Sequence, residues 1–409
     1  MALGKAPSGT GLAAQRRRIA AAYFLYFATF GLYLPYFPAY LRDRGVDGVG
    51  IGLILAIYPL MRWVLPPVWG LLSDRYQGVK FWGSIAAWGA LAGLLILLLG
   101  EGFPALVFGA VVYFLFKSPL IPLLDSVALH HLAKSDKGNY GHLRLWGSLG
   151  FIATSLGFGL VFPDLPGTYI AMALLVSHFL FAFHWSRMPS SEMAAPERPN
   201  WAQYRSLFTY RPLLILLGAV FIHRVGMASY GGFFTLYVQG LGYPGSIVAW
   251  TWGIGVIMEV FIMLRVDRGI ERFGAARIFA LGTMVDALRW WAYATYPPAT
   301  ALLLLAPLHG VAFTLVYVAM VRQVGSMVGP QLRASGQGLA AAAAGGGEMM
   351  GLVVGGWFHD ISDRLLFGFA GTAALLATIT ILLSLRAGPG PGIPPTGEDP
   401  GDRNQAGSD

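Results

Sequence analysis

The segments GLLSDRYQGVK (Gly70–Lys80) and LRVDRGIERFG (Leu264–Gly274) each end the second long apolar run of one half of the chain, and each contains an Asp-Arg pair. A second match precedes them: YFPAYLRDRG (Tyr36–Gly45) and FFTLYVQGLG (Phe233–Gly242) share a tyrosine and a glycine at one fixed offset. Two apolar helices often look alike by chance, so the recurring Asp-Arg segments are the stronger signal. We therefore interpret the two halves as copies of one helical unit.

The composition places the chain in a lipid bilayer. Of its 409 residues, 56% are hydrophobic and only 12% are charged, whereas a soluble domain has about 25% charged residues. A water-soluble core cannot hide this excess of apolar side chains, so lipid must solvate it. The 54 glycines and 12 tryptophans fit membrane helices and their interfacial ends. Cysteine is absent, which excludes disulfides, thiolate metal sites and thiol nucleophiles.

Runs of roughly 20 apolar residues mark membrane-spanning helices, and the chain contains enough of them for twelve spans. The first run follows Arg16–Arg18 and has no small-residue cleavage site after it, so we expect a retained helix and not a signal peptide. The approximate spans are 19–41, 49–72, 81–99, 103–129, 144–163, 167–185, 212–238, 246–264, 277–296, 299–321, 333–357 and 365–385.

The distribution of basic residues predicts the orientation. Of the 28 Lys and Arg residues, only Arg42, Arg44 and Arg364 fall in loops on the side opposite to the termini. Basic loops stay in the cytoplasm, so we expect both termini there, in a multi-pass protein of the inner (cytoplasmic) membrane. The net charge of +8 comes from these short loops, and we expect no nucleic-acid partner.

A proline-containing polar connection divides the chain in two. We expect an all-α membrane protein of two pseudo-symmetric six-helix bundles, which is an architecture of secondary transporters. The tail is rich in Pro, Gly and acids and is expected to be disordered. The predicted parts are an N-terminal bundle at 1–185, a cytoplasmic linker at 186–211, a C-terminal bundle at 212–386 and the tail at 387–409.

Several segments resemble the major facilitator superfamily over its whole twelve-helix length. The loop Gly70–Lys80 is similar to the signature loop of that superfamily, with one extra residue before Gly78. The closest resemblance is to the 3-phenylpropionate permease group, relatives of the lactose permease. It rests on PYFPAYLRDRG, PPVWGLLSDR, PLLDSVAL, LHGVAF and above all YGHLRLWGSLGF (Tyr140–Phe151).

The resemblance implies proton-driven uptake of a small polar or anionic organic solute by alternating access. In lactose permease, charges that handle substrate and protons fall where this chain has Arg144, Glu259, Arg289 and His309. Asp125 lies close to the position of the carboxylate in the N-terminal half of lactose permease. One departure puts proton coupling in doubt. The carboxylate expected one turn past His309 is absent, because Ala312 and Phe313 occupy that stretch.

Charged groups in the second half also stand out without the resemblance. A charge at mid-membrane costs from about 2.5 to more than 10 kcal/mol, so each needs a partner or an aqueous cavity, and Asp, Glu and His chains form proton relays there. Asp286 and Arg289 share a helix face and can pair, which would also suit a purely structural ion pair. His309 can relay protons or only hydrogen-bond across helices. Glu259 and Glu348 are further candidates, although Glu348, after three glycines, can equally lie near a helix end.

The first half offers the candidate substrate site. Arg144 can hold a carboxylate through its planar fork or serve as an inner gate, and Asp125, on the preceding helix, can meet it. Tyr26, Phe30 and Tyr33 recur at helical spacing and can line a cavity suited to an aromatic solute, although lipid packing also explains aromatic residues here.

The repeated Asp-Arg pairs predict a cytoplasmic gate. Asp74 and Arg75, with Asp267 and Arg268 as their counterpart, can latch that side through neighbouring helix N-termini and basic groups. Ordinary orientation charge explains the arginines but not the repeated aspartates.

Other classes of protein fit less well. The chain has no GxxxxGK[ST] loop for a nucleotide-driven pump, and its asymmetric charges differ from a repeated channel filter. A membrane-embedded enzyme is the alternative of a different class, but His130-His131 lacks further ligands at metal spacing. We expect a monomeric proton-coupled symporter of a small organic solute, with an aromatic or other carboxylic acid favoured, and neither cofactor nor metal. A sugar or nucleoside permease and a drug exporter of the same fold are the alternatives.

Overall fold

The computed structural model describes residues 9–65, 69, 78–133, 140–188, 205, 207–328 and 332–386. Within these ranges the regular structure is helical, without a strand. The first half contains α1 (Gly9–Asp43), α2 (Gly48–Val64), α4 (Gly78–Leu99), α5 (Gly102–Lys117), α6 (Leu120–Ala133), α7 (Tyr140–Val161) and α8 (Gly167–Ser186). The second half contains α10 (Arg211–Gly240), α11 (Gly245–Met263), α12 (Val266–Phe273), α13 (Ala275–Tyr293), α14 (Ala299–Met327), α15 (Arg333–Ile361) and α16 (Asp363–Arg386).

The helices confirm an all-α membrane protein. Among the described residues, ten helical stretches are long and apolar enough to cross a membrane. The two other predicted spans coincide with α2, whose described part has 17 residues, and with α13, which contains Arg277, Asp286 and Arg289. The exact count of twelve spans stays a prediction.

The fourth predicted span, 103–129, lies within one helical stretch long enough to cross a membrane, Gly102–Leu132, and this stretch contains a local break. Helix α5 ends at Lys117 and α6 begins at Leu120, so Ser118 and Pro119 break what the sequence indicated as one helix. Proline has no backbone N–H to donate and cannot continue the helical ladder without a kink. The break lies directly after Lys117, which is fully buried.

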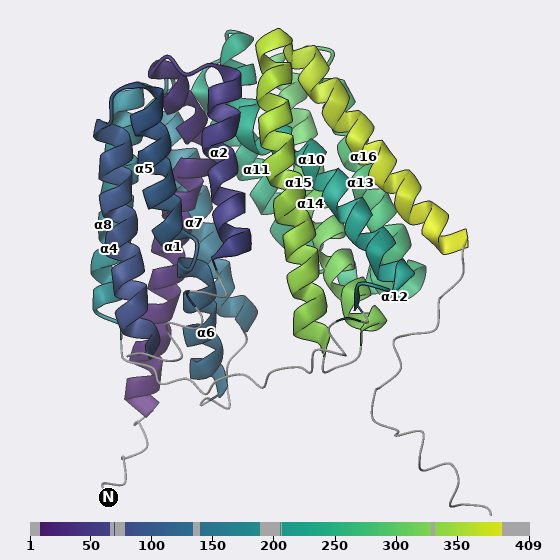
Figure 1. The fold of residues 1–409 in the computed structure, drawn as a ribbon, viewed down its shortest axis with the longest axis horizontal. Helices are drawn as coiled ribbons and strands as arrows, with labels where there is room; N and C mark the ends of the chain where they lie inside the picture. Colours follow the sequence, from purple (N-terminus) through teal and green to yellow (C-terminus); the bar gives the residue numbers. More distant parts are fainter. Residues whose placement is uncertain are drawn as a thin grey trace, which may run out of the picture.

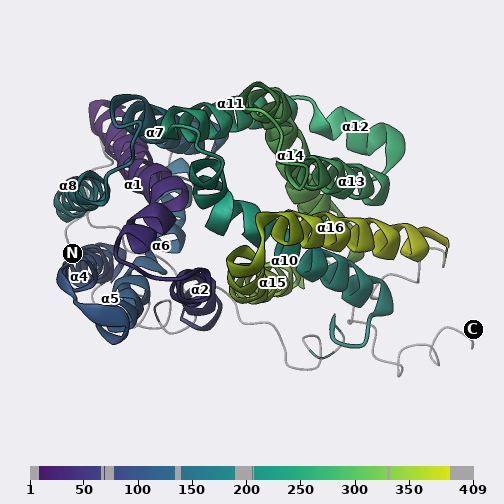
Figure 2. The ribbon, with the colours of Figure 1, turned by 90° about the horizontal axis from the view of Figure 1, so that it is seen from above.

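The helices form two groups (Figure 1). In the first, α1 packs on α7 and α8, and α4 packs on α5 and α8; in the second, α10 packs on α15 and α16, and α13 packs on α14 and α16. Two seams join the groups, α2 against α15 and α7 against α11, with a smaller contact between α1 and α10. Seen from above, the two seams lie on opposite sides of the molecule (Figure 2).

The seam between α2 and α15 depends on glycine. A side chain at Gly52 would collide with the carbonyl oxygen of Leu352, and one at Gly356 would collide with that of Gly48. These pairs show that α2 and α15 run in opposite directions with their backbones in contact. Glycine is required because any side chain would push the two helices apart.

The groups meet at the end of the molecule farthest from the N-terminus of α1. The Asp360 carboxylate, at the end of α15, accepts hydrogen bonds from the backbone N–H groups of Gly48 (2.7 Å) and Val49 (2.9 Å) at the start of α2. On the other seam, the N–H of Gly245 donates to the carbonyl of Pro163 at 2.6 Å. The helix groups diverge toward the opposite end, where α1 begins (Figure 1).

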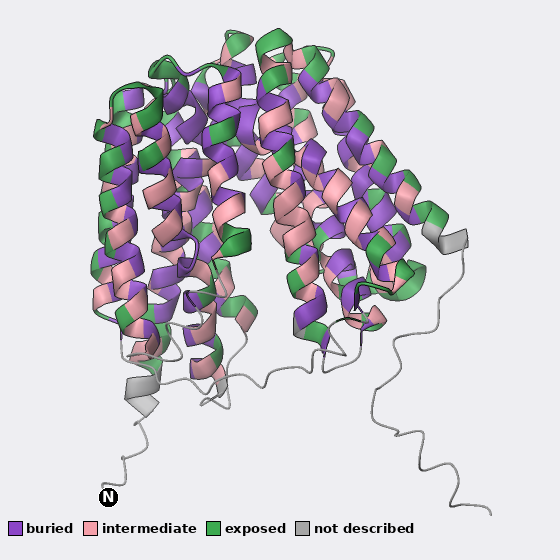
Figure 3. Cartoon of the chain, in the orientation of Figure 1, coloured by how far each residue is buried: buried purple, intermediate pink, exposed green. Residues whose placement is uncertain are grey.

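Large apolar side chains cover the outer faces of the helices. Leu304, Phe108 and Trp357 are 79%, 61% and 55% exposed, and exposed residues lie along the periphery while buried ones lie between helices (Figure 3). Water would not tolerate an apolar surface of this extent on a monomer. Lipid is the solvent that fits it.

Candidate functional site

A cavity of about 390 Å³ lies between the two groups of helices, within the range of small-molecule sites. Its wall is mainly aromatic. The aromatic lining residues are Tyr26, Phe27, Phe30, Tyr33, Tyr58, Phe151, Tyr230, Trp252, Phe313 and Tyr317. The ionisable lining residues that the structure describes are Arg62, Arg144, Arg224, Glu259, His309 and Glu348.

The three aromatic residues predicted on the first helix all line this cavity. Tyr26, Phe30 and Tyr33 lie on one face of α1 because helical positions three and four apart coincide. The Tyr26 hydroxyl is 3.4 Å from that of Tyr58, and the Phe30 ring is 6.3 Å from that of Phe151. The result is a continuous aromatic wall on the side of the first group.

Arg144 and Glu259 face the cavity from opposite groups. Arg144 is in α7 and Glu259 in α11, the two helices of one seam, and both side chains line the cavity. The Arg144 Cζ atom lies 3.9 Å from the centroid of the Phe27 ring. Opposite charges therefore face one another across this seam.

Asp125 lies outside the cavity lining. Its carboxylate accepts hydrogen bonds from the hydroxyls of Tyr23 (2.5 Å) and Tyr140 (2.9 Å), and within the described contacts it has no ion pair with Arg144. The tyrosine hydroxyls satisfy the Asp125 carboxylate, so the expected meeting of the two charges does not occur here.

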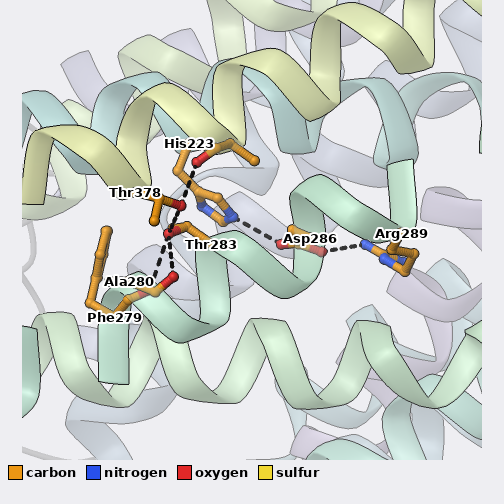
Figure 4. Close-up of polar contacts among 8 residues, drawn as sticks. His223, Phe279, Ala280, Thr283, Asp286, Arg289 and Thr378 are labelled. Atoms are coloured by element: carbon orange, nitrogen blue, oxygen red, sulfur yellow. Dashed lines mark hydrogen bonds and ion pairs between the residues drawn. The ribbon is translucent and has the colours of Figure 1, made fainter. Parts of the chain in front are cut away.

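A fully buried charge cluster lies in the second group (Figure 4). Asp286 accepts from Arg289 Nη2 at 2.7 Å and is 2.9 Å from His223 Nε2. The i,i+3 pair of Asp286 and Arg289 expected on one helix face is therefore present. His223 is the partner that the sequence did not indicate, because it comes from α10, far away in the chain.

His309 connects this cluster to the cavity. It is buried in α14, and its ring lies 4.8 Å from the ring of Tyr230 and 5.5 Å from that of Trp252. The Arg289 Cζ atom in turn lies 4.6 Å from the Tyr230 centroid. The ring of Tyr230 therefore lies between the buried charge cluster and His309, which lines the cavity.

Glu348 faces the cavity together with two arginines. Its helix, α15, packs against α2, which carries Arg62, and against α10, which carries Arg224, and all three side chains line the cavity. Neither Arg62 nor Arg224 was a predicted site residue, because only the packing of three helices brings these residues together with Glu348.

Only the second half of the expected cytoplasmic gate, Asp267 and Arg268, lies within the described residues. Asp74 and Arg75 lie outside the described residues. Asp267 pairs with Arg322 at 2.7 Å, with both side chains more than half exposed, and such surface pairs contribute little. This pair links α12 to α14 within one group, and Arg268 is exposed, so the described contacts of this segment do not bridge the groups. Within the described part of the chain, no three His, Asp or Glu residues are grouped as metal ligands.

Comparison with known proteins gives a consistent picture. The model of the "MFS_1 like family" matches residues 17–369. The maltose permease of Geobacillus stearothermophilus is 29% identical over 86% of this chain and 89% of its own length. The "Probable 3-phenylpropionic acid transporter" of Escherichia coli (strain K12) is 26% identical over 88% and 96%. A mutant of the nucleoside transporter NupG has the same fold, with a TM-score of 0.82 at 17% identity over 90% of this chain and 99% of its own.

Proposed function

This chain belongs to the MFS_1 like family and is a secondary transporter of the major facilitator superfamily, not an enzyme; we propose that it couples the movement of a small organic acid to that of protons. The observation that supports this most is the cavity itself. It combines an aromatic wall for an apolar body with charged side chains from both helix groups. Small polar sites of this kind orient a ligand within an otherwise apolar pocket.

The proton path in this proposal begins at Glu259. Its carboxylate and Arg144 attract one another across the seam between α7 and α11, and protonation of Glu259 cancels that attraction. His309, the Asp286–Arg289 pair and Glu348 supply further groups of the kind that relay protons within membranes. Coupling follows if the protonated and charged states favour different arrangements of the two groups.

The two bundles at 1–185 and 212–386 are proposed to move against each other around this cavity. We place the protein in the inner membrane of the cell, with both termini in the cytoplasm. The end closed by Asp360 then faces out of the cell, and the end at which the helix groups diverge faces the cytoplasm. The described arrangement then corresponds to the inward-facing state. The protein acts as a monomer, with the solute, protons and lipid as its only partners.

A sugar or nucleoside permease is the second candidate. It is favoured by the 29% identity to the maltose permease and by the tyrosine hydroxyls of the cavity. A neutral solute of this kind would use hydrogen bonds and ring stacking and would need no net charge in the wall.

The decisive test is the pH inside proteoliposomes when 3-phenylpropionate, maltose or uridine is added outside. We expect internal acidification with 3-phenylpropionate beyond that of protein-free liposomes, because weak acids also cross lipid unaided. Glu259→Gln should abolish this excess while labelled solute still exchanges, and Glu271→Gln, an exposed position on α12, should leave it intact.

Each contrary result removes a different part of the proposal. Acidification with maltose or uridine alone would select the second candidate. Exchange of labelled solute without acidification would mean uncoupled transport, and full coupling in Glu259→Gln would remove Glu259 from the proton path. If no solute causes acidification and no labelled solute exchanges, the proposed substrate classes are refuted and an exporter is favoured.

A further inference from the structure

Three consecutive glycines, Gly345 to Gly347, let α15 pack closely against both α2 and α10. A Cβ atom at Gly345 would lie 3.6 Å from the carbonyl oxygen of Pro59, and one at Gly347 would collide with the carbonyl oxygen of Phe221. The two neighbours belong to different helix groups, so α15 is in backbone contact with both groups at this level. At Gly347 the close approach requires a residue without a side chain, whereas a Cβ atom at Gly345 would make an ordinary contact.

A charged residue follows each of these contacts. Arg62, Arg224 and Glu348 lie three positions after Pro59, Phe221 and Gly345, so each shares a helix face with its contact. Side chains on a helix lean toward its N-terminus. Because α2 and α15 are antiparallel, Arg62 and Glu348 lean toward one another. All three side chains line the cavity.

The positive charge in the cavity is unevenly placed. On the seam between α7 and α11, Arg144 faces the opposite charge of Glu259. On the other side, Arg62 and Arg224 line the cavity together with Glu348. Within the described part of the chain, neither Arg62 nor Arg224 has an ion pair shorter than 4.0 Å. The described lining of the cavity therefore contains three arginines and two glutamates, which leaves one positive charge in excess.

We propose that Arg62 and Arg224 form an anion-binding subsite that takes the single carboxylate of a small organic acid. This inference rests on the proposed function and assigns the acid group to a place in the cavity. With a monoanion bound, two arginines face two carboxylates, one of them Glu348, and the local charge is balanced. A guanidinium suits this task because its planar fork matches a carboxylate.

The subsite also explains how the rest of the ligand is held. The Tyr58 ring lies 5.5 Å from the Cζ atom of Arg62, and the Phe313 ring lies 5.9 Å from that of Arg224. Both rings line the cavity and flank the acid group. Because Arg62 belongs to the first group and Arg224 to the second, a bound carboxylate contacts both groups beside the seam between α2 and α15.

The test compares binding of 3-phenylpropionate with that of its neutral amide, 3-phenylpropanamide. Purified protein in detergent is titrated with each while tryptophan fluorescence is recorded, since Trp252 lines the cavity. Arg62→Gln and Arg224→Gln should each weaken acid binding about 10- to 100-fold with little effect on the amide. Glu348→Gln should tighten acid binding by about fivefold or more, because two positive charges then face one anion.

Arg277→Gln is the matched control, since Arg277 is exposed and lies outside the cavity lining, and its acid-to-amide ratio should equal that of the wild type. If an Arg→Gln variant loses its gel-filtration peak, Arg→Lys at the same position keeps the charge and should still weaken acid binding through loss of the fork.

Three results would overturn the subsite. An unchanged acid-to-amide ratio at either arginine refutes it, and so does a loss that occurs only in Arg144→Gln. A wild type that binds no acid refutes both this inference and the acid in the proposed function. Acid binding that depends on both arginines without coupled acidification would support the subsite and refute only the proton coupling.

Discussion

Removal of the Asp360 carboxylate should shift the protein toward its outward-open state. Asp360 belongs to the second group and accepts two hydrogen bonds from the N-terminus of α2, at 2.7 and 2.9 Å. Hydrogen bonds to charged groups contribute about 1.5–3 kcal/mol when buried, and exposure of this carboxylate reduces that to about 1 kcal/mol each. The loss of about 2 kcal/mol in Asp360→Ala corresponds to roughly a 30-fold change in the ratio of the two states.

The cysteine-free chain allows a direct assay. Ala249 is fully buried in α11, close to Gly159 of α7, on the seam that must open outward. Ala249→Cys is labelled in membranes with an impermeant maleimide from outside. When labelling is slower than the conformational exchange, its rate follows the outward-open fraction. Adding Asp360→Ala should raise this rate roughly 30-fold by the energy above, and Asp360→Asn, which keeps one acceptor oxygen, should lie between.

The control is Asp164→Ala, an exposed acid in the loop between α7 and α8, which should leave the labelling rate unchanged. An Asp360→Ala protein that labels at the parental rate, while the denatured protein labels fully, would refute the latch. A fall in the rate would show that Asp360 favours the opposite state.

Three further substitutions test the packing. Asp286→Ala should lower the free energy of unfolding by about 3–5 kcal/mol, because Arg289 is left buried without its partner; a melting temperature equal to that of the wild type in detergent would contradict this. Lys117→Met should leave the melting temperature unchanged or raise it, since the ammonium is buried with a tyrosine hydroxyl at 2.8 Å and without a carboxylate among its described contacts; a large drop would show that the charge stabilises the fold. Gly150→Val should destabilise by about 1–3 kcal/mol, because its side chain would collide with the backbone of Phe24, and normal yield with normal melting would refute that.

The fold followed from the sequence because its main determinants are local. Apolar runs of membrane length and the repeated halves predicted an all-α transporter, and the structure and the relatives confirm the all-α fold and the transporter class. The break at Pro119 was missed, although proline is visible in the sequence, because hydropathy runs through it without interruption.

The site was predictable only in part. The spacing of Tyr26, Phe30 and Tyr33 gave one wall of the cavity, since residues on one helix face can be recognised within one segment. The contact of His223 with Asp286 joins two helices distant in the chain, and local spacing cannot predict such a pair.

The bare backbone contact between α2 and α15 also bears on how fast the protein can cycle. Interlocked side chains would have to disengage one after another each time the joint opened, and each would add to the activation barrier. At Gly52 and Gly356 no side chains interlock between α2 and α15. The two helices could therefore separate in one step and return to the same register. In the proposed cycle, the glycines of this seam would therefore govern the rate of opening, while the residues of the cavity govern which solute binds.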